Sequence, residues 1–111
     1  MQRLCQGQVV DLETLDPQGQ NLKRRPVVVL DVNEALGEFV YVAVSTQLSD
    51  PLPDSWVLLP WSRDGRGTGL VEPCAAKTHW IGKAKRDDVA RIRGHLSTDA
   101  MLEIMRAIKR H

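Results

Sequence analysis

The sequence contains few of the residues that build metal centres or disulfide frameworks. Its two cysteines, Cys5 and Cys74, are far apart in the chain, and neither belongs to a Cys-x-x-Cys pair or stands beside a cluster of histidines. This pattern argues against a zinc site, and free thiols in a reducing compartment are the simpler interpretation. We therefore expect no metal and no cofactor.

Long hydrophobic runs are also absent. No apolar stretch approaches the roughly 20 residues that cross a bilayer, and the N-terminus lacks the apolar core of a signal peptide. The sequence predicts a cytoplasmic protein with no membrane association.

An excess of charge of one sign is missing too. The chain has 15 Lys and Arg against 14 Asp and Glu, so its net charge is +1. Any site for an anion must therefore be local rather than a property of the whole surface. With 111 residues and 42% hydrophobic content, the chain is expected to form a single domain over residues 1–111.

The most informative stretch is residues 23–30, Lys-Arg-Arg-Pro-Val-Val-Val-Leu. Lys23, Arg24 and Arg25 precede an apolar β-branched run, and Pro26 fixes the backbone between the charged and the apolar parts. Because proline has no N–H for a sheet ladder, we expect Pro26 to begin a strand or to lie on an edge. Such a junction is a candidate site for chemistry on an anion.

Alternating and continuous apolar patterns predict a mainly β protein. We expect strands at residues 8–15, 27–32, 37–46, 56–61 and 70–72. The short connection between the second and third of these favours an antiparallel hairpin. In that hairpin Arg25 and Thr46 lie at the same end, distal to the turn.

Two helices are predicted at the C-terminal end. Residues 87–96 begin with paired acids and carry apolar side chains on one side, and residues 98–109 follow the i, i+3, i+4, i+7 rule after Ser97, a good N-cap. Strands followed by helices, without βαβ alternation, indicate a small curved antiparallel sheet or partly open barrel with helices packed against it.

These features resemble the MazF/PemK family of bacterial toxins, the ribonuclease half of toxin–antitoxin pairs. The motifs that carry the resemblance are Gly7-Gln8-Val9-Val10, the loop with Pro17 and Gly19, Arg25-Pro26-Val27-Val28-Val29, Thr46, and Thr68-Gly69-Leu70. The resemblance implies an SH3-like barrel that forms a homodimer, cuts single-stranded RNA without a metal ion and binds a cognate antitoxin. It also implies that Arg25 and Thr46 are active-site residues.

Two positions depart from the family pattern. Some members carry Arg-Thr followed by an aspartate in the region where this chain has Lys77 and Thr78 and no adjacent carboxylate. A proline is often found two residues before the threonine of the third strand, where this chain has Val44.

The chemistry of metal-free RNA cleavage explains why these residue types are of interest. The 2′-hydroxyl attacks the neighbouring phosphate, and negative charge gathers on phosphoryl oxygens, which a guanidinium meets with two parallel N–H bonds. Arg25 fits that role, and Thr46 is suited to donate a hydrogen bond to a non-bridging oxygen. His79 is the candidate general acid or base, because an unperturbed imidazole changes charge near neutral pH.

Other residues are candidates for binding RNA. We assign that role to Lys23, Arg24, Gln47 and Lys77, with the loop at residues 16–21 along the edge of the groove. The three tryptophans, Trp56, Trp61 and Trp80, have the chemistry to stack bases, although we expect at least two of them in the core or a dimer interface.

Each assignment has a structural alternative. Arg25 is then a solvated charge at a strand end, Thr46 an ordinary β-forming residue and His79 a surface histidine. Two functional alternatives stay open as well: a non-catalytic toxin of the same fold that inhibits a protein target such as DNA gyrase, and an inactive RNA-binding module. RNA cleavage measured beside a supercoiling assay separates these classes.

Overall fold

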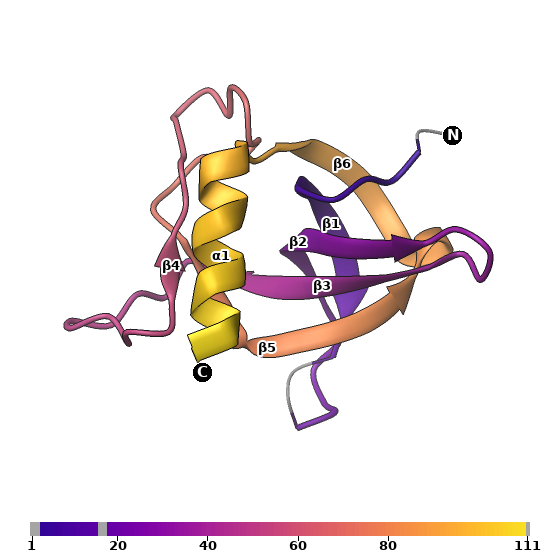
Figure 1. Cartoon of the computed structure of the whole chain (residues 1–111), viewed down its shortest axis with the longest axis horizontal. Coiled ribbons are helices and arrows are strands. Elements are labelled where there is room, and N and C mark those ends of the chain that lie inside the picture. Colours follow the sequence, from indigo (N-terminus) through magenta and orange to yellow (C-terminus); the bar gives the residue numbers. More distant parts are fainter. Residues whose placement is uncertain (1–2, 16–17, 111) are drawn as a thin grey trace.

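The computed structural model describes residues 3–15 and 18–110 of the chain. Within these residues, six strands form one antiparallel sheet in the order β4-β5-β3-β2-β1-β6, and one α-helix follows them. The elements are β1 Gln8–Thr14, β2 Lys23–Asn33, β3 Glu38–Ser45, β4 Val57–Leu58, β5 Ala75–Lys85, the 3-10 turn η1 Arg86–Asp88, β6 Val89–His95 and α1 Thr98–Arg110. Figure 1 shows the sheet curling round without closing, with α1 and β4 beside one another. The predicted class, a mainly β, partly open SH3-like barrel, is confirmed.

Buried side chains form two clusters, one on each face of the sheet. Alternate residues of β2 show the division, because Val28 packs in the cluster that includes Ile104 and Ala107 of α1, whereas Val27 and Val29 pack in the other. We call the face that carries the second cluster the inner face. Its buried members are Leu4, Val10, Leu12, Val27, Val29, Phe39 and Tyr41.

The β2–β3 hairpin has the antiparallel register expected from its short connection. Val27 pairs with Ala43, and the ladder runs to the turn with an irregularity after Val29. The expectation that Pro26 begins a strand or lies on an edge is wrong, because β2 begins at Lys23 and lies between β1 and β3 in the sheet. At Pro26, however, the described ladder joins β2 to Asp11 of β1, and pairing with β3 starts only at Val27. A residue without an N–H is therefore tolerated at this position.

The helix predicted at residues 87–96 is wrong, because these residues form the end of η1 and strand β6. Val89 and Ile92 are three apart, as on a helix, yet both pack on the inner face. The register of β6 against β1 shifts twice, and each extra residue moves the next side chain to the other face. Gly94 also lies against the loop that contains Gly67. A Cβ added to Gly94 would be 2.1 Å from the carbonyl oxygen of Gly67.

The predicted pairing of residues 56–61 with residues 70–72 is wrong as well. The first segment contributes only the two-residue strand β4, the second forms no strand, and β4 pairs instead with β5, which the sequence patterns did not predict. The alternating pattern of β5 is interrupted by extra residues. Ala43 of β3 pairs with Lys77, but its neighbour Val42 pairs with Ile81. Residues 78–80, which we call the β5 bulge, lie between these two pairs.

The last helix was predicted correctly. The Ser97 hydroxyl accepts a hydrogen bond from the Ala100 N–H at 3.1 Å, as expected of an N-cap. Met101, Ile104 and Ala107 are buried against the sheet.

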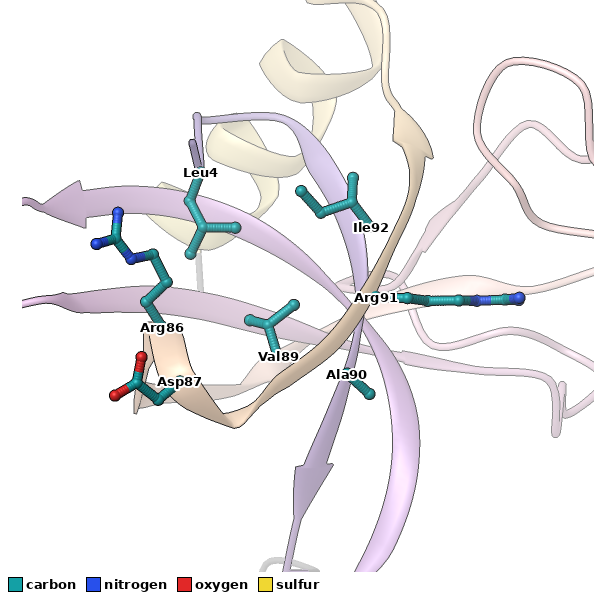
Figure 2. A pocket seen from close by; sticks show the side chains of 7 residues that line it. All are labelled: Leu4, Arg86, Asp87, Val89, Ala90, Arg91 and Ile92. Carbon is teal, nitrogen blue, oxygen red and sulfur yellow. The ribbon is translucent and has the colours of Figure 1, made fainter. Parts of the chain in front are cut away.

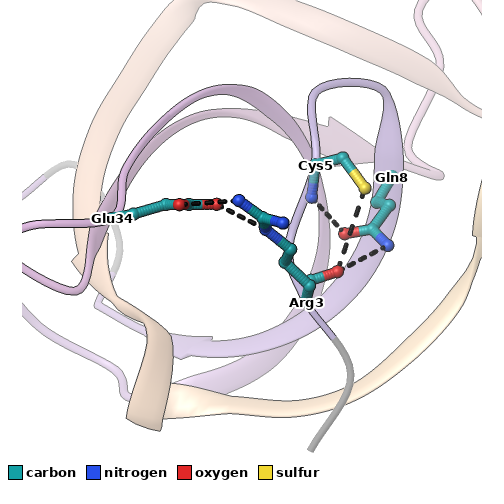
Figure 3. Close-up of polar contacts among 4 residues, drawn as sticks. All are labelled: Arg3, Cys5, Gln8 and Glu34. Carbon is teal, nitrogen blue, oxygen red and sulfur yellow. Dashed lines mark hydrogen bonds and ion pairs between the residues drawn. The ribbon is translucent and has the colours of Figure 1, made fainter.

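The segment before β1 is tied to the turn of the β2–β3 hairpin (Figure 3). Arg3 donates to both carboxylate oxygens of Glu34, at 2.6 and 2.8 Å. The Gln8 side chain accepts from the Cys5 N–H at 2.8 Å and donates to the Arg3 carbonyl at 3.3 Å. These bonds place Leu4, 4% exposed, in the inner-face cluster.

Candidate functional site

Arg25 lies on the inner face, at the end of the hairpin distal to its turn. It pairs with the buried residue Leu12 of β1, and it stands two residues before Val27 on β2, so all three side chains share this face. The Nε atom of Arg25 is buried and has no hydrogen-bond partner among the described residues. Buried polar groups are normally satisfied in native proteins. The fold therefore leaves hydrogen-bonding capacity of this guanidinium unused.

Two cations meet one aromatic ring beside the β5 bulge. The Cζ atom of Arg25 lies 5.2 Å from the ring centroid of Trp80, and the Nζ atom of Lys77 lies 5.0 Å from it. In the described part of the chain, neither cation forms an ion pair with a carboxylate. A cation–π contact holds a positive charge in place without neutralising it. Both charges are thus positioned yet available to an anion.

A second aromatic ring joins His79 to these cations. The Trp56 and His79 rings stack with centroids 5.8 Å apart and planes 23° apart, and the indole Nε1–H donates to His79 Nδ1 at 3.2 Å. The Nζ atom of Lys77 is 5.2 Å from the Trp56 ring. We call Arg25, Trp56, Lys77, His79 and Trp80 the cation–aromatic cluster.

The backbone around the β5 bulge is anchored next to this pair of rings. The hydroxyl of Thr78, a buried residue, donates to the carbonyl of Ser55. Thr78 precedes His79 and Ser55 precedes Trp56, so one hydrogen bond ties the two backbone segments that carry the stacked rings.

Three of the predicted site residues therefore come together, namely Arg25, Lys77 and His79. The aromatic members Trp56 and Trp80 tie them to one another. Sequence patterns did not group these tryptophans with the cations, because Trp56 depends on the pairing of β4 with β5 and Trp80 depends on the bulge of β5 opposite β3. Trp61 is 44% exposed, and none of the three tryptophans belongs to the buried core of the chain.

Thr46 lies at the end of the hairpin distal to its turn, the end that also carries Arg25, as expected. It follows β3 directly and is exposed, and none of the hydrogen bonds, ion pairs or ring contacts among the described residues joins it to Arg25. Extending the Val27–Ala43 pair by two residues brings Ser45, not Thr46, opposite Arg25. Side chains alternate along a strand, so Ser45 shares the face of Arg25.

The hydroxyl of Ser45 is half exposed at the end of β3. It accepts a hydrogen bond from the Gln47 N–H at 3.1 Å and donates a long one to the Gln47 carbonyl at 3.5 Å. Gln47 itself is exposed and lies after the end of the strand. The register therefore places a hydroxyl on the same face as Arg25, one residue before the predicted one.

The remaining predicted RNA contacts lie outside the cluster. Lys23 and Arg24 are exposed at the start of β2, and an Arg24 Nη atom lies 3.7 Å from the carboxylate of its cross-strand neighbour Glu13. Of the loop at residues 16–21, Asp16 and Pro17 fall outside the described residues, and the rest is exposed.

A pocket of about 490 Å³ opens beside β6, away from these residues (Figure 2). Figure 2 shows Leu4, Val89 and Ile92 gathered on one side of it, while Arg91 points the other way and binds Asp11 at 2.9 Å. Among the described residues, its lining includes no imidazole, thiol or hydroxyl. The pocket is therefore a poor candidate for the cleavage of RNA.

Two further observations concern the described residues only. No three of their His, Cys, Asp and Glu side chains approach closely enough to bind a metal ion. Their one α-helix is too short and too polar to span a membrane.

Comparison with known proteins adds to this geometry. The model of a family described as PemK-like, MazF-like toxins of type II toxin–antitoxin systems matches residues 6–111. MazF (Form-I) from Deinococcus radiodurans superposes with a TM-score of 0.77 at 18% identity, over 99% of this chain and 96% of that chain. An endoribonuclease in complex with its cognate antitoxin, from a mycobacterial species, gives 0.72 at 18% identity, over 97% and 93%.

A third solved structure has the same architecture. The toxin MazF-mt6 from Mycobacterium tuberculosis gives a TM-score of 0.65 at 19% identity, over 92% of this chain and 93% of that chain. At these identities the solved structures establish the fold alone. No curated protein matches the sequence significantly.

Proposed function

Because the chain belongs to the PemK-like, MazF-like toxins of type II toxin–antitoxin systems, we propose that it is an endoribonuclease that cleaves single-stranded RNA without a metal ion. The cation–aromatic cluster carries this proposal. Arg25 and Lys77 lie 5.2 and 5.0 Å from one ring and have no carboxylate partner among the described residues. That arrangement suits a phosphate, which brings the missing negative charge.

The reaction needs little beyond charge and position. The 2′-oxygen forms a bond to phosphorus and the bond from phosphorus to the 5′-oxygen breaks, leaving a 2′,3′-cyclic phosphate and a free 5′-hydroxyl. Water takes the proton of the 2′-hydroxyl and returns one to the 5′-oxygen. Arg25 and Lys77 meet the charge that develops on the non-bridging oxygens, and one such donor is worth roughly 10²- to 10³-fold in rate.

Side-chain hydroxyls and further polar groups complete the proposed site. A hydroxyl at the end of β3, either Thr46 by resemblance or Ser45 by register, donates to a phosphate oxygen. Lys23, Arg24 and Gln47 line the approach of the RNA and act through its backbone charge. His79 joins this proposed site through Trp56, whose indole N–H binds its Nδ1 atom and whose ring lies 5.2 Å from the Nζ atom of Lys77.

Two partners follow from the same proposal. One is a second copy of the chain, which forms a homodimer with a groove for RNA near its interface. The other is a cognate antitoxin, which covers the groove with an acidic, apolar peptide and uses the cations that bind RNA.

Purified full-length protein incubated with a long single-stranded RNA and a chelator tests the enzyme. We expect discrete cuts with cyclic-phosphate ends, which disappear in Arg25→Ala and persist in Arg3→Ala, a variant that loses the same charge at the opposite end of the hairpin. Intact RNA with folded protein would overturn the proposal and direct attention to a protein target, tested by gyrase supercoiling. RNA bound in a salt-dependent manner but never cut would indicate the inactive binding module.

A further inference from the structure

We infer that Trp56 fixes His79 as a neutral imidazole with its proton on Nε2, so that His79 acts on RNA as a hydrogen-bond donor and as neither general acid nor general base. The RNA-facing half of this inference rests on the proposed function. The tautomer itself does not.

The hydrogen bond between the two rings determines the protonation pattern. An indole Nε1–H only donates, so His79 Nδ1, 3.2 Å away, must present its lone pair. In a neutral imidazole one nitrogen accepts and the other carries the hydrogen. The proton therefore lies on Nε2, which is the nitrogen left for a ligand.

This pattern conflicts with both conventional roles of a histidine in RNA cleavage. A general base needs a free lone pair, but that of Nδ1 is already used and Nε2 has none. A general acid needs the imidazolium, whose Nδ1–H would point at the Trp56 N–H. What remains is a neutral N–H directed at a phosphate oxygen, which adds to the charge stabilisation by Arg25 and Lys77.

Several contacts hold the pair in this geometry. The rings stack at 5.8 Å with an interplanar angle of 23°, and the hydrogen bond from Thr78 to Ser55 ties the backbone immediately before each ring. Lys77 lies over the other ring of the pair, 5.2 Å from the Trp56 centroid. Trp56 is thus a positioning residue that acts through His79.

The nitrogen chemical shifts of the imidazole test the tautomer directly in the intact chain. The sequence contains three histidines, and loss of one signal in His79→Ala assigns the ring. We expect the Nε2–H form in the wild type and a mixture of forms in Trp56→Phe, which keeps an aromatic ring but removes the indole N–H. Trp61→Phe, a change at an exposed ring, serves as the matched control. A wild-type ring with its proton on Nδ1 would overturn the inference.

Cleavage of the RNA substrate tests the role. Glutamine offers a neutral N–H and cannot act as an acid or base near neutral pH. His79→Gln therefore keeps the hydrogen bond, and we expect it to cleave within about tenfold of wild type. His79→Ala should lose roughly 10²-fold. Equal loss in both variants would overturn the donor role. If the wild type cuts no RNA, the proposed function fails while the nitrogen shifts still decide the tautomer.

Discussion

The cations of this protein are held in two different ways. At the hairpin turn, Arg3 is bound by both oxygens of Glu34, and along β6 the carboxylate of Asp11 lies 2.9 Å from Arg91 and 3.6 Å from Arg93. At the other end of the hairpin, Arg25 lies against an aromatic ring with no carboxylate partner among the described residues. A carboxylate partner neutralises the positive charge of the cation, whereas an aromatic ring holds the cation in position and leaves its charge available to a ligand.

This difference separates residues that stabilise the fold from residues that are kept for binding. A buried guanidinium nitrogen without a partner contributes a desolvation cost to the folded state. The Nε atom of Arg93 is buried without a hydrogen-bond partner as well, but its Nη1 atom lies 3.6 Å from the Asp11 carboxylate. Arg25 differs because no carboxylate among the described residues lies beside it, and a partner from outside the chain explains that difference. Substitutions that remove one charge from each class distinguish the two kinds of cation.

The largest effect is expected from Arg25→Met. Methionine retains the apolar stem and removes the guanidinium, so RNA cleavage should fall by roughly 10²- to 10³-fold. The free energy of unfolding in urea should stay the same or rise, because an unsatisfied buried nitrogen has been removed. A clear loss of stability in this variant would place Arg25 among the structural cations.

The converse is expected from Asp11→Asn. Asp11 is 8% exposed, and without its charge Arg93, whose side chain is 17% exposed, keeps no ionised partner among the described residues. The free energy of unfolding should drop by about 2 kcal/mol, less than for a fully buried pair because Arg91 is largely exposed. RNA cleavage by the folded variant should be unchanged. If Asp11→Asn instead kept its stability and lost RNA cleavage, the separation of structural from ligand-binding cations would be contradicted.

A smaller effect distinguishes the two hydroxyls at the end of β3. The register places Ser45 on the face of Arg25, so Ser45→Ala should slow cleavage by about tenfold, the value of a hydrogen bond to a charged group. Thr46→Ala should slow it less. Rates measured at saturating RNA with both variants decide the matter. A larger loss in Thr46→Ala would favour the residue named by family resemblance.

Local patterns were sufficient for the part of the fold that carries Arg25. The apolar run after Pro26, the short connection to β3 and the capped helix α1 are each specified by neighbouring residues. The predicted proximity of Arg25 to the end of β3 follows from hairpin geometry alone. These features depend on few distant contacts, and the structure has them as predicted.

Strands β5 and β6 could not be predicted from local patterns, because bulges interrupt the alternation of apolar and polar residues in both. In β6, Val89 and Ile92 share a face at a spacing that normally indicates a helix. In β5, the bulge at residues 78–80 brings His79 and Trp80 to the cations. Gly82 marks the close approach of β5 to β3, because a Cβ added at this position would lie 2.5 Å from the Tyr41 hydroxyl. That requirement is visible only once β3 and β5 are paired.

The smallest change in stability is expected from the ion pair between Arg3 and Glu34, in which the guanidinium donates to both carboxylate oxygens. The hydrogen bonds from Arg3 hold the pKa of Glu34 below its ordinary value of 4.5. A carboxyl with a lowered pKa in the folded state contributes stability above its unfolded value, and the contribution disappears as the pH falls through the folded pKa. Glu34→Gln should therefore destabilise the chain slightly at neutral pH and not at all in strong acid.

Urea unfolding of wild type and Glu34→Gln, from neutral pH to strong acid, measures the difference in their free energies of unfolding. Both side chains are exposed, with 76% and 52% of their areas accessible, so water and salt screen the pair and 1 M salt should remove most of the effect. Cleavage of RNA should not change. If Glu34→Gln instead lowers cleavage as Arg25→Met does, the hairpin turn and the cation–aromatic cluster are coupled, and the separation of structural from ligand-binding cations does not hold for this protein.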